Sequence, residues 1–598
     1  MEHTLAIKIA GVAIPLPTDL EMNVDLMNPF FETETNINFF NYPFTVPNSD
    51  ELAVVLGYPS VVDLSRLANT FQDFAGAELY IDNILFRRGT LTVSEATPDE
   101  VTLYFRDRLG ELRDAVEDKT LRDLVFDEVD LTAYGADLVD AADDLLTQAV
   151  DSIKVIFAPA YHALLPGQLD GNGNEIFMLC LNNYDPVAGT FLVQHDASVS
   201  TQYHNCFVPF PFLRPVMKEC FEEHGYTLSS DLFSNTDFNR LIIHNSRSLI
   251  KAAPVDNWPM LYEESIAVPD AVEELEVNIE KHLPGMKILE FLSEIKKLFN
   301  TAIVFHNVLP QAEMLHWATI VTDNETEDWT DIADPDLRIE EPEQPDVLRR
   351  YEEDSDNGIL ENKVFPLGNS DEVGSGGVEL VADLPTPTIE GTVCLVKSLN
   401  HYYKVVSVDS VLQWQFFSYN IQEYKDGSGE EEIVNQSALL PTDMYTNDWF
   451  PLYDNFPFKV TKLGYNDWTD GYKVLGGDFK LRLMFYRGLQ DIDVTYQAPL
   501  ATVDNYNSLA DQVGNWTLHW HGLGGLWDTH WHSFYEMLKY KPVTFNIRFD
   551  MVKLLNLSFK KFQIIRGQKY YIKRIRLHLP RIEESEVEFF KVPEPVEI

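Results

Sequence analysis

Apolar and polar residues alternate along much of the first 110 residues of the chain. In AELYIDNILFRRGTLTVSEATPDEVTLYFRD, residues 77–107, this alternation is typical of strands with one buried face. Asp82-Asn83 and Thr97-Pro98-Asp99 interrupt it with residues that favour turns, so the stretch predicts a meander of strands. The short apolar stretch LAIKIAGVAI near the N-terminus has no basic segment before it, and predicts a first strand and not a signal peptide.

The spacing of apolar residues changes to three and four in the middle of the chain, which predicts amphipathic helices. Such helices are predicted over residues 109–125, 134–153, 210–228 and 286–300. In the third segment one apolar stripe is more typical of core than of a cofactor-binding face, and Gly225 is expected to end the helix. The stripe consists of Phe212, Val216, Met217, Cys220 and Phe221. Residues 301–307 and 314–321 predict strands.

Residues 323–383 break this pattern, because they are rich in acidic residues, proline and glycine. We interpret them as a solvated linker or loop. Beyond them the chain is β-rich again, over residues 391–408, 412–424, 479–487 and 568–580. The predicted fold class is a β-rich, multidomain α+β protein in which two barrel-like β regions flank a mixed α/β middle. The predicted domains are an N-terminal β domain (1–115), a mixed middle domain (116–322), the linker region (323–383) and a C-terminal β-rich domain (384–598).

The composition argues against several classes of protein. Hydrophobic residues make up 45% and aromatic residues 12% of the 598 residues, which suits several packed cores and excludes wholesale disorder. The net charge of −50 repels nucleic-acid backbones, although an acidic surface suits a conduit through which DNA slides. Solubility or a saline environment is the simpler explanation of this charge. No run of about 18 apolar residues occurs, so no membrane span is predicted.

Common catalytic and cofactor motifs do not occur in the chain. Phosphate-binding loops, dinucleotide-binding glycine motifs, HExxH and GxSxG are all missing from the sequence. The cysteines form no CxxC pair, so neither a disulfide framework nor a zinc knuckle is predicted, and synthesis in a reducing compartment is favoured. They are Cys180, Cys206, Cys220 and Cys394.

One stretch has a superficial likeness to a calcium loop. Asp170, Asn172 and Asn174 have the spacing of the first ligands of such a loop. However, Glu175 and Leu181 stand where that loop needs glycine and glutamate. We therefore interpret the stretch as a hairpin turn.

The stretch LHWHGLGGLWDTHWH, residues 518–532, contains two His-x-His pairs, His519/His521 and His530/His532. Within a strand both histidines of a pair share a face, and four imidazoles could bind zinc or copper. Within a helix, positions i and i+2 point about 200° apart, and Asp528 is a good N-cap for a helix over DTHWHSFYEML. We therefore favour structural or surface histidines, and no catalytic, cofactor-binding or metal-binding residue is predicted.

Several stretches stand in an order that is typical of one family. They are Asn28-Pro29-Phe30-Phe31, Tyr42-Pro43-Phe44-Thr45-Val46-Pro47 followed by LAVVLGYP, LFRRGTLTV, PFPFLRPVMKECFEEHGYTL, MKILEFLSEIKKLFNTAIVF with Trp329-Thr330-Asp331 downstream, Phe485-Tyr486-Arg487-Gly488, and GLWDTHWHSFYEML. Together they resemble the baseplate hub or tail-tip structural proteins of tailed phages and prophages, similar to the trimeric hub of contractile tails and phage-like injection systems. Glu51-Leu52-Ala53 stands where that family usually has an asparagine, and of the residues around the histidines only Trp531 matches the family pattern.

The resemblance implies a structural protein and not an enzyme, with no cofactor. Such a hub is a homotrimer whose subunits each contribute two tube-like β-barrels, so that three chains present a pseudo-sixfold ring to the tail tube. The implied partners are the tail tube protein, a spike or tail-tip protein and other baseplate proteins, while DNA passes through without specific binding. The implied location is the tail or baseplate of the virion, after synthesis in the cytoplasm of the bacterial host. Host attachment and genome ejection are the implied processes.

Two other functions stay open. A receptor-binding or fibre-attachment tail protein could use aromatic residues near acids to stack on sugars, although such aromatics are more often paired within a β core. These residues are Tyr402, Tyr403, Trp414, and Trp449 beside Asp448. An enzyme could be a metal-dependent hydrolase through the histidine pairs or a glycan hydrolase through two carboxylates. A final aromatic group is expected to be mainly core and partly subunit contact: Phe30, Phe31, Phe39, Phe40, Tyr42 and Phe44.

Overall fold

The computed structural model describes residues 4–17, 20–31, 41–56, 73–107, 112, 115–162, 180–192, 207–245, 249–251, 272–273, 275–306, 309–339, 347–351, 378, 380–390, 392–396, 401–408, 411–419, 423–426, 432–435, 442–445, 458–463, 481–492, 495–507, 509, 511–520, 523–582 and 585–593. Among these residues, no helix combines the length and the apolar character that crossing a membrane requires.

A six-stranded antiparallel sheet forms from the start of the chain. Its order is β2-β1-β5-β6-β7-β4. The strands are β1 (Leu5–Ile9), β2 (Val12–Ala13), β4 (Asn41–Pro47), β5 (Asp73–Ile81), β6 (Ile84–Ala96) and β7 (Glu100–Asp107). Asp82 and Asn83 join β5 to β6 with φ angles of 50° and 62°, a conformation that these residue types tolerate well in tight hairpins. The predicted meander and the predicted first strand are both confirmed.

A seven-stranded sheet draws its strands from the beginning, the middle and the end of the chain. Its order is β22-β35-β36-β37-β34-β23, with β3 also paired to β36. The strands are β3 (Met22–Met27), β22 (Thr326–Asp328), β23 (Ala333–Ile339), β34 (Val543–Ile547), β35 (Phe562–Ile565), β36 (Gln568–Leu579) and β37 (Ser585–Lys591). The interpretation of 323–383 as linker or loop is therefore wrong for residues 326–339, and also for β24 (Val347–Tyr351), which is the central strand of a separate small sheet. The predicted domain boundaries stay a prediction.

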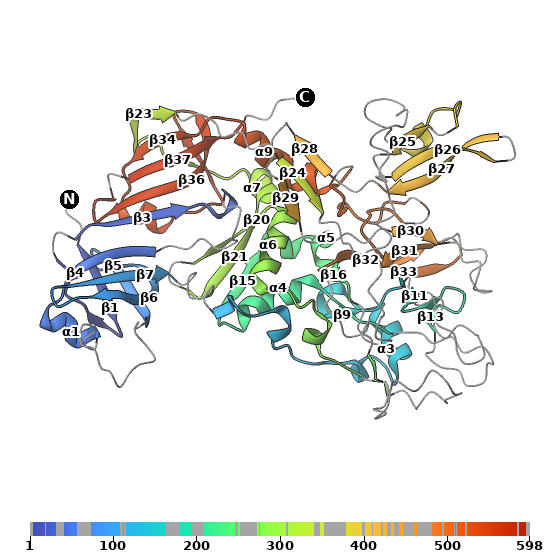
Figure 1. Ribbon diagram of the computed structural model, residues 1–598, viewed down its shortest axis with the longest axis horizontal. Helices are drawn as coiled ribbons and strands as arrows, with labels where there is room; N and C mark the ends of the chain where they lie inside the picture. The colour runs from blue at the N-terminus through green and yellow to red at the C-terminus, as the bar shows by residue number, and fades with distance from the viewer. Residues whose placement is uncertain are drawn as a thin grey trace.

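The two sheets pack their apolar faces against one hydrophobic core. Ile7, Leu79 and Phe105 from the six-stranded sheet belong to the same buried cluster as Ile575 and Val587 from the seven-stranded sheet. Figure 1 shows the two sheets one above the other at the same end of the molecule, with β3 between them. The chain is thus β-rich and contains two half-barrel sheets, in agreement with the outline of the predicted fold class.

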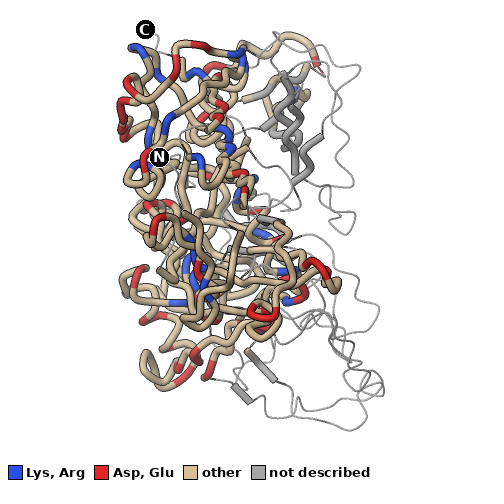
Figure 2. The backbone as a smooth tube through the Cα atoms, turned by 90° about the vertical axis from the view of Figure 1, so that its left-hand side faces the viewer, with Lys and Arg blue, Asp and Glu red and all other residues tan. Residues whose placement is uncertain are grey.

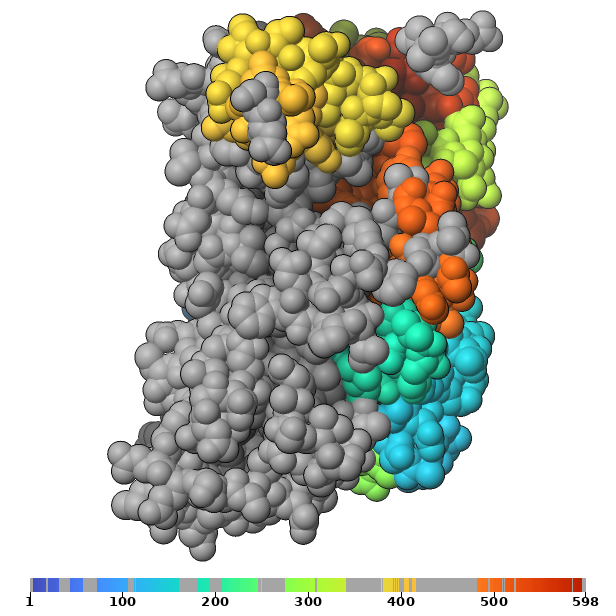
Figure 3. Space-filling model, turned by 90° about the vertical axis from the view of Figure 1, so that its right-hand side faces the viewer, coloured from blue at the N-terminus to red at the C-terminus, as the bar shows by residue number. Residues whose placement is uncertain are grey.

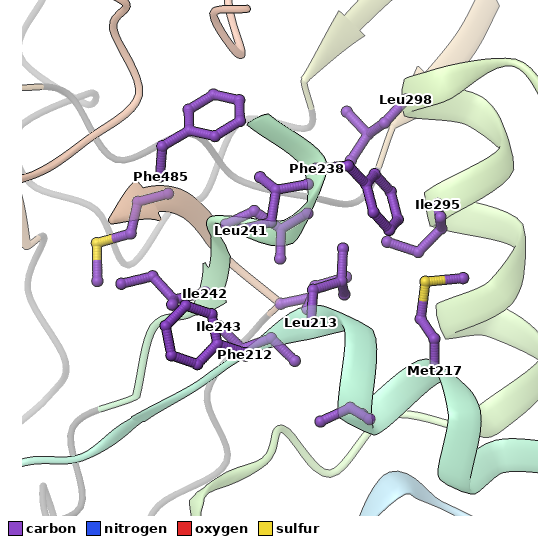
Figure 4. Close-up of a cluster of buried hydrophobic side chains, with 14 of the residues drawn as sticks. Phe212, Leu213, Met217, Phe238, Leu241, Ile242, Ile243, Ile295, Leu298 and Phe485 are labelled. Carbon is purple, nitrogen blue, oxygen red and sulfur yellow. The ribbon is translucent and has the colours of Figure 1, made fainter. Parts of the chain in front are cut away.

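The middle of the chain forms a mixed α/β body. Helices α4 (Leu213–Glu222) and α6 (Ile288–Phe299) confirm two predicted helices, and the apolar stripe of α4 is buried. Gly225 follows α4 with a φ of 78°, which a residue with a side chain rarely adopts. Figure 4 shows side chains of both helices meeting those of α5 (Thr236–Asn239), β16 (Leu241–Ile243) and β32 (Leu483–Asp491) in one apolar cluster.

The remaining strands of the body form small sheets. β15 (Thr227–Ser230), β21 (Gln311–His316) and β20 (Thr301–Phe305) form one, and β33 (Gln497–Thr502) extends β16 and β32 into another. β25 (Val393–Val396), β26 (His401–Val408) and β27 (Val411–Tyr419) form a three-stranded sheet, which confirms predicted strands. This sheet lies at the upper end of the face in Figure 3, above the orange segment that contains β32 and β33.

Three predicted elements need correction. The helix predicted over 109–125 is broken at Thr120, which is extended and forms a bridge with Lys287; only a 3-10 turn, η2 (Leu121–Asp123), follows. The helix predicted over 134–153 is shorter, consisting of α3 (Leu138–Leu145) and the separate turn η4 (Val150–Ser152). The strand predicted over 314–321 ends at His316, where α7 (Trp317–Asp323) begins. In the first case tertiary pairing overrides the local apolar spacing.

Candidate functional site: buried histidines and a buried arginine

The histidine stretch is neither a strand nor a helix that starts at Asp528. Residues 518–520 form a bend, and the helical segment begins at Leu526, continues as a π-helical turn, η10 (Trp527–Trp531), and is followed by α9 (His532–Leu538). Asp528 therefore lies inside the first turn, which corrects the predicted N-cap. His521 lies outside the described residues.

His530 pairs with a histidine that the sequence did not single out. Its Nδ1 lies 2.8 Å from Nε2 of His316, and Nδ1 of His316 lies 2.9 Å from the hydroxyl of Thr319. The rings of Phe299 and Trp516 pack edge-on against His530, at centroid distances of 5.3 and 4.6 Å. Within the described part of the chain, Nε2 of His530 has no hydrogen-bond partner.

Burial keeps both imidazoles neutral. It lowers the pKa of His316 to about 3, and it lowers the pKa of His530 well below its usual value, with the neighbouring His316 adding to the effect. Two neutral rings at hydrogen-bond distance share one donated proton, so one nitrogen donates and the other accepts. The pair therefore links β21 to η10 as a buried structural contact.

The other two described histidines of the His-x-His pairs, His519 and His532, lie in different surroundings from His530 and from each other. Nε2 of His519 pairs with the carboxylate of Asp504, and both side chains are almost buried. His532 is 56% exposed and lies 3.7 Å from Glu536 on the same helix. Among the described residues, no three His, Cys, Asp or Glu side chains are grouped so that they could hold a metal ion. Each described histidine of the two pairs therefore contacts a different partner: His316, Asp504 or Glu536.

Arg487 lies at the centre of a second buried polar contact. Its guanidinium donates to Asp237 at 2.5 Å and to the backbone carbonyls of Trp516 at 2.6 Å and of Asp504 at 3.1 Å. Asp237 also accepts from the backbone N–H of Asn515 at 3.1 Å. Burial lowers the pKa of Arg487 to about 10, and the carboxylate of Asp237 opposes that shift, so the side chain stays charged at neutral pH. Arg487 ties β32 and α5 to residues 504–516.

Three of the stretches that carry the family resemblance, residues 28–31, 286–305 and 525–538, meet near these contacts. The side-chain amide of Asn300 donates to the carbonyl of His530 at 2.9 Å, and Nε1 of Trp531 donates to the carbonyl of Lys297 at 3.0 Å. Lys296 donates to the carbonyl of Pro29 at 2.6 Å. The asparagine before that proline, Asn28, donates to the carbonyl of Ile572 in β36 at 2.7 Å.

Aromatic rings complete this joint, by which we mean the contacts between the segment 28–31, helix α6, residues 526–535 and strand β36. Phe30 is buried against Trp317, Phe534 and Tyr571, at centroid distances between 5.9 and 6.3 Å. Phe31 stacks on Phe590 at 5.3 Å. The expectation that Phe30 and Phe44 are core is confirmed, while Phe39, Phe40 and the side chain of Tyr42 lie outside the described residues. The joint connects the mixed body to the seven-stranded sheet.

Most residues that the sequence suggested for sugar stacking, calcium binding or cysteine chemistry lie outside this joint. Nε1 of Trp414 donates to the carbonyl of Pro385 at 2.6 Å, and burial raises the pKa of Tyr403, so both contribute to packing around β26 and β27. Cys220 and Cys394 are buried. The remaining candidates lie outside the described residues or have side chains that do: Tyr402, Asp448, Trp449, Asp170, Asn172, Asn174, Glu175, Cys180 and Cys206.

Sequence reasoning missed three residues of these contacts. His316, Asp237 and Asp504 stand 214, 250 and 15 positions from their partners His530, Arg487 and His519. No spacing rule connects residues so far apart. A weak signal existed for Arg487, because a charged residue inside the apolar strand 481–487 needs a buried partner.

Solved structures that are similar to the chain include two tail proteins. No family model matches the chain, and no curated protein matches it. The chain is similar in structure to the tail protein from Neisseria meningitidis MC58, with a TM-score of 0.30 and 8% identity over 99% of this chain and 97% of that one. It is similar at the same TM-score to the 43 kDa tail protein of prophage MuSo2 from Shewanella oneidensis, with 7% identity over 99% of this chain and 97% of that one.

Proposed function

We propose that this chain is a structural protein of a phage tail or phage-like particle, and that it acts as the hub of the baseplate. The observation that carries the proposal is the joint. Three of the stretches that resemble the hub family, residues 28–31, 286–305 and 525–538, contact one another there, through the pairs Lys296–Pro29, Asn300–His530 and Trp531–Lys297.

The architecture supports the same role. Two half-barrel sheets that share a core provide curved walls of the kind from which a ring of barrels can be built. A hub of this kind forms a homotrimer, contacts the tail tube protein on one side and a spike or tail-tip protein on the other, and lets DNA pass. The net charge of −50 suits that passage, because an acidic wall repels the phosphate backbone.

The proposal includes the absence of catalysis and of a bound cofactor. The proposed location of the protein is the tail or baseplate of the virion, after synthesis in the bacterial cytoplasm. The described histidines of the two pairs support a structural role, since His530 is buried against His316 and His519 and His532 each lie beside a carboxylate.

The first experiment measures the mass of the purified chain by light scattering, at low and at high salt. A trimer of the 68.5 kDa chain is the expected result. Salt is expected to favour it, because screening weakens the repulsion between acidic subunits. Co-purification with the tail tube protein and detection of the chain in purified particles test the location.

The outcomes separate the candidate functions. Failure of the chain to associate with tube protein, together with its absence from particles, would overturn the hub. Stoichiometric zinc or copper in untagged protein, with a hydrolase activity that His519→Ala removes, would instead establish the metal-dependent enzyme. Adsorption blocked by an antibody against the chain would favour the receptor-binding function.

A further inference from the structure

The pair of His316 and His530 lies where two separate hydrophobic cores meet. One core belongs to the two sheets, and the other belongs to the mixed body. Among the described residues the two cores have no member in common, so each keeps its own packing when the contacts between them loosen. Helix α9 contacts β37, and η10 contacts α6 and α7, so the histidines stand on the side of the body that faces the seven-stranded sheet (Figure 1). That sheet adds three rings to the core of the body: Phe562, Tyr571 and Phe590.

The contact between the two imidazoles positions rings of the joint. Trp317 follows His316 directly and packs against Tyr571 at a centroid distance of 4.9 Å. Phe534 stands four positions after His530 and lies 5.0 Å from Trp317. A displacement of either imidazole therefore moves an aromatic ring that connects the body to the seven-stranded sheet.

The protein holds the buried side chains of this contact at few atoms. His530 and Asn300 are both fully buried. No protein group among the described residues pairs with Nε2 of His530 or with Oδ1 of Asn300. Loosening the joint therefore sacrifices no protein hydrogen bond at these two atoms, while each becomes able to bind solvent.

A proton added to either imidazole meets no compensating charge. The groups that face the two rings are Phe299, Asn300, Trp516 and Thr319, and none of them titrates. The charged groups of the surrounding elements, as far as the structure describes them, are directed elsewhere: Lys296 to the carbonyl of Pro29, Lys297 to Glu294, Glu313 to Lys560, His532 and Lys539 to Glu536, Arg487 to Asp237 behind the backbone of Trp516, and His519 to Asp504, while Glu290 lies in the first turn of α6 and Asp323 and Asp528 are exposed.

We propose that His316 and His530 form an acid-sensitive latch that closes the joint. While both imidazoles are neutral, their hydrogen bond holds η10 against the end of β21. Protonation places like charges against each other among apolar rings, so the contact breaks and the joint loosens, while the two cores stay packed. The inference rests on these contacts and not on the proposed function.

The histidines set the pH range of the latch. Burial lowers the pKa of His316 to about 3, so the ring binds its proton more readily in the open joint, and acid favours opening. From an ordinary pKa of about 6.5, the opening equilibrium rises about thirtyfold at pH 5 for each histidine that stays neutral in the closed joint. Surface carboxylates titrate near pH 4, so the ion pairs among the interleaved acidic and basic positions of Figure 2 persist at about pH 5.

Hydrogen exchange of the full chain, followed by mass spectrometry, tests the latch. Rates are normalised to the intrinsic rate of each peptide at each pH. Between about pH 7 and pH 5, peptides from residues 526–538 are expected to exchange on the order of thirtyfold faster or more. At about pH 5 they are expected to exchange at least about tenfold faster than peptides from β6 and α4, which report the two cores. Equal rates for all three sets at that pH would show that only global unfolding exposes the joint, and would overturn the latch.

Histidine variants provide the second arm. The double variant His316→Gln/His530→Leu is expected to lose most of the pH response of residues 526–538. His532→Gln is the matched control, because His532 is 56% exposed beside Glu536 on the same helix, and it is expected to behave as the parent chain. A double variant that responds to pH as the parent does would rule the latch out. If the double variant fails to fold, His530→Gln decides the question, since it is expected to lose about thirtyfold of the response and an unchanged response contradicts the proposal.

Discussion

Replacing Arg487 with methionine tests whether the buried arginine is the main polar contact between β32, α5 and residues 504–516. Arg487 is 1% exposed and Asp237 is 4% exposed, so the substitution leaves a buried carboxylate whose remaining donor, among the described residues, is the N–H of Asn515. It also removes the donor to the carbonyl of Trp516. Breaking a buried ion pair from one side costs about 3–5 kcal/mol of unfolding free energy, which is a large share of the total for a typical protein.

The double variant Arg487→Met/Asp237→Leu separates pairing from packing. It removes the uncompensated charge, so about 2 kcal/mol of the loss is expected to return. Recovery stays incomplete, because the backbone groups that the two side chains satisfied lose their partners.

Urea unfolding followed by tryptophan fluorescence measures both effects. Arg576→Met serves as the control, because Arg576 pairs with Glu586 at 3.3 Å with about half of each side chain exposed, and a loss below about 1 kcal/mol is expected there. A loss below about 1 kcal/mol for Arg487→Met, or a double variant no more stable than the single one, would refute the reasoning.

Three further predictions concern the histidines and their neighbours. Burial lowers the pKa of folded His316 to about 3 and that of folded His530 well below its usual value, so the unfolded chain binds more protons below about pH 6.5. Stability is therefore lost as pH falls below about 6.5, by about 1.4 kcal/mol per pH unit for each histidine while it stays neutral in the folded chain. Urea midpoints between about pH 7 and 5 are expected to show a shallower slope in His530→Met, and an equal slope would contradict the assignment. Asn300 has a φ of 47° and donates to His530, so Asn300→Ala is expected to cost about 2–3 kcal/mol and Asn300→Gly about 1 kcal/mol less in thermal unfolding; equal losses would show that backbone strain is unimportant. A chelator is expected to leave the unfolding midpoint of the untagged chain unchanged, with a shift of several degrees contradicting the absence of a structural metal.

The spacing of apolar residues predicted an element correctly where the apolar face that it defines is also the face buried in the structure. Helices α4 and α6 have one apolar face, and that face is buried in the structure, so the period of three and four was a reliable guide. The helix predicted over 109–125 has the same period, but its backbone at Lys119 and Leu121 pairs with Ile288 and Met286 instead. Spacing alone carries no information about such a distant partner.

Residues 323–339 show a second limit of prediction from composition. The segment is acidic and opens the proline- and glycine-rich region 323–383, which suggested a solvated linker, because charge usually implies exposure. The charges are indeed exposed, but they face a basic stretch more than 200 residues later, and Trp329 is buried between β22 and β23. For the candidate site, the sequence singled out His519 and His530, but their partners Asp504 and His316 could be identified only from the fold.

The pairing of β3 with β36 can form only after almost the whole chain has been synthesised. Asn28 must wait for Ile572, which is 544 positions later, before its hydrogen bond can form. At roughly 5–20 residues per second, translation takes about half a minute to two minutes to cover that distance. Throughout that interval the apolar face of the six-stranded sheet has no partner sheet. Fragments released before the last strands are made are therefore expected to aggregate through that exposed face.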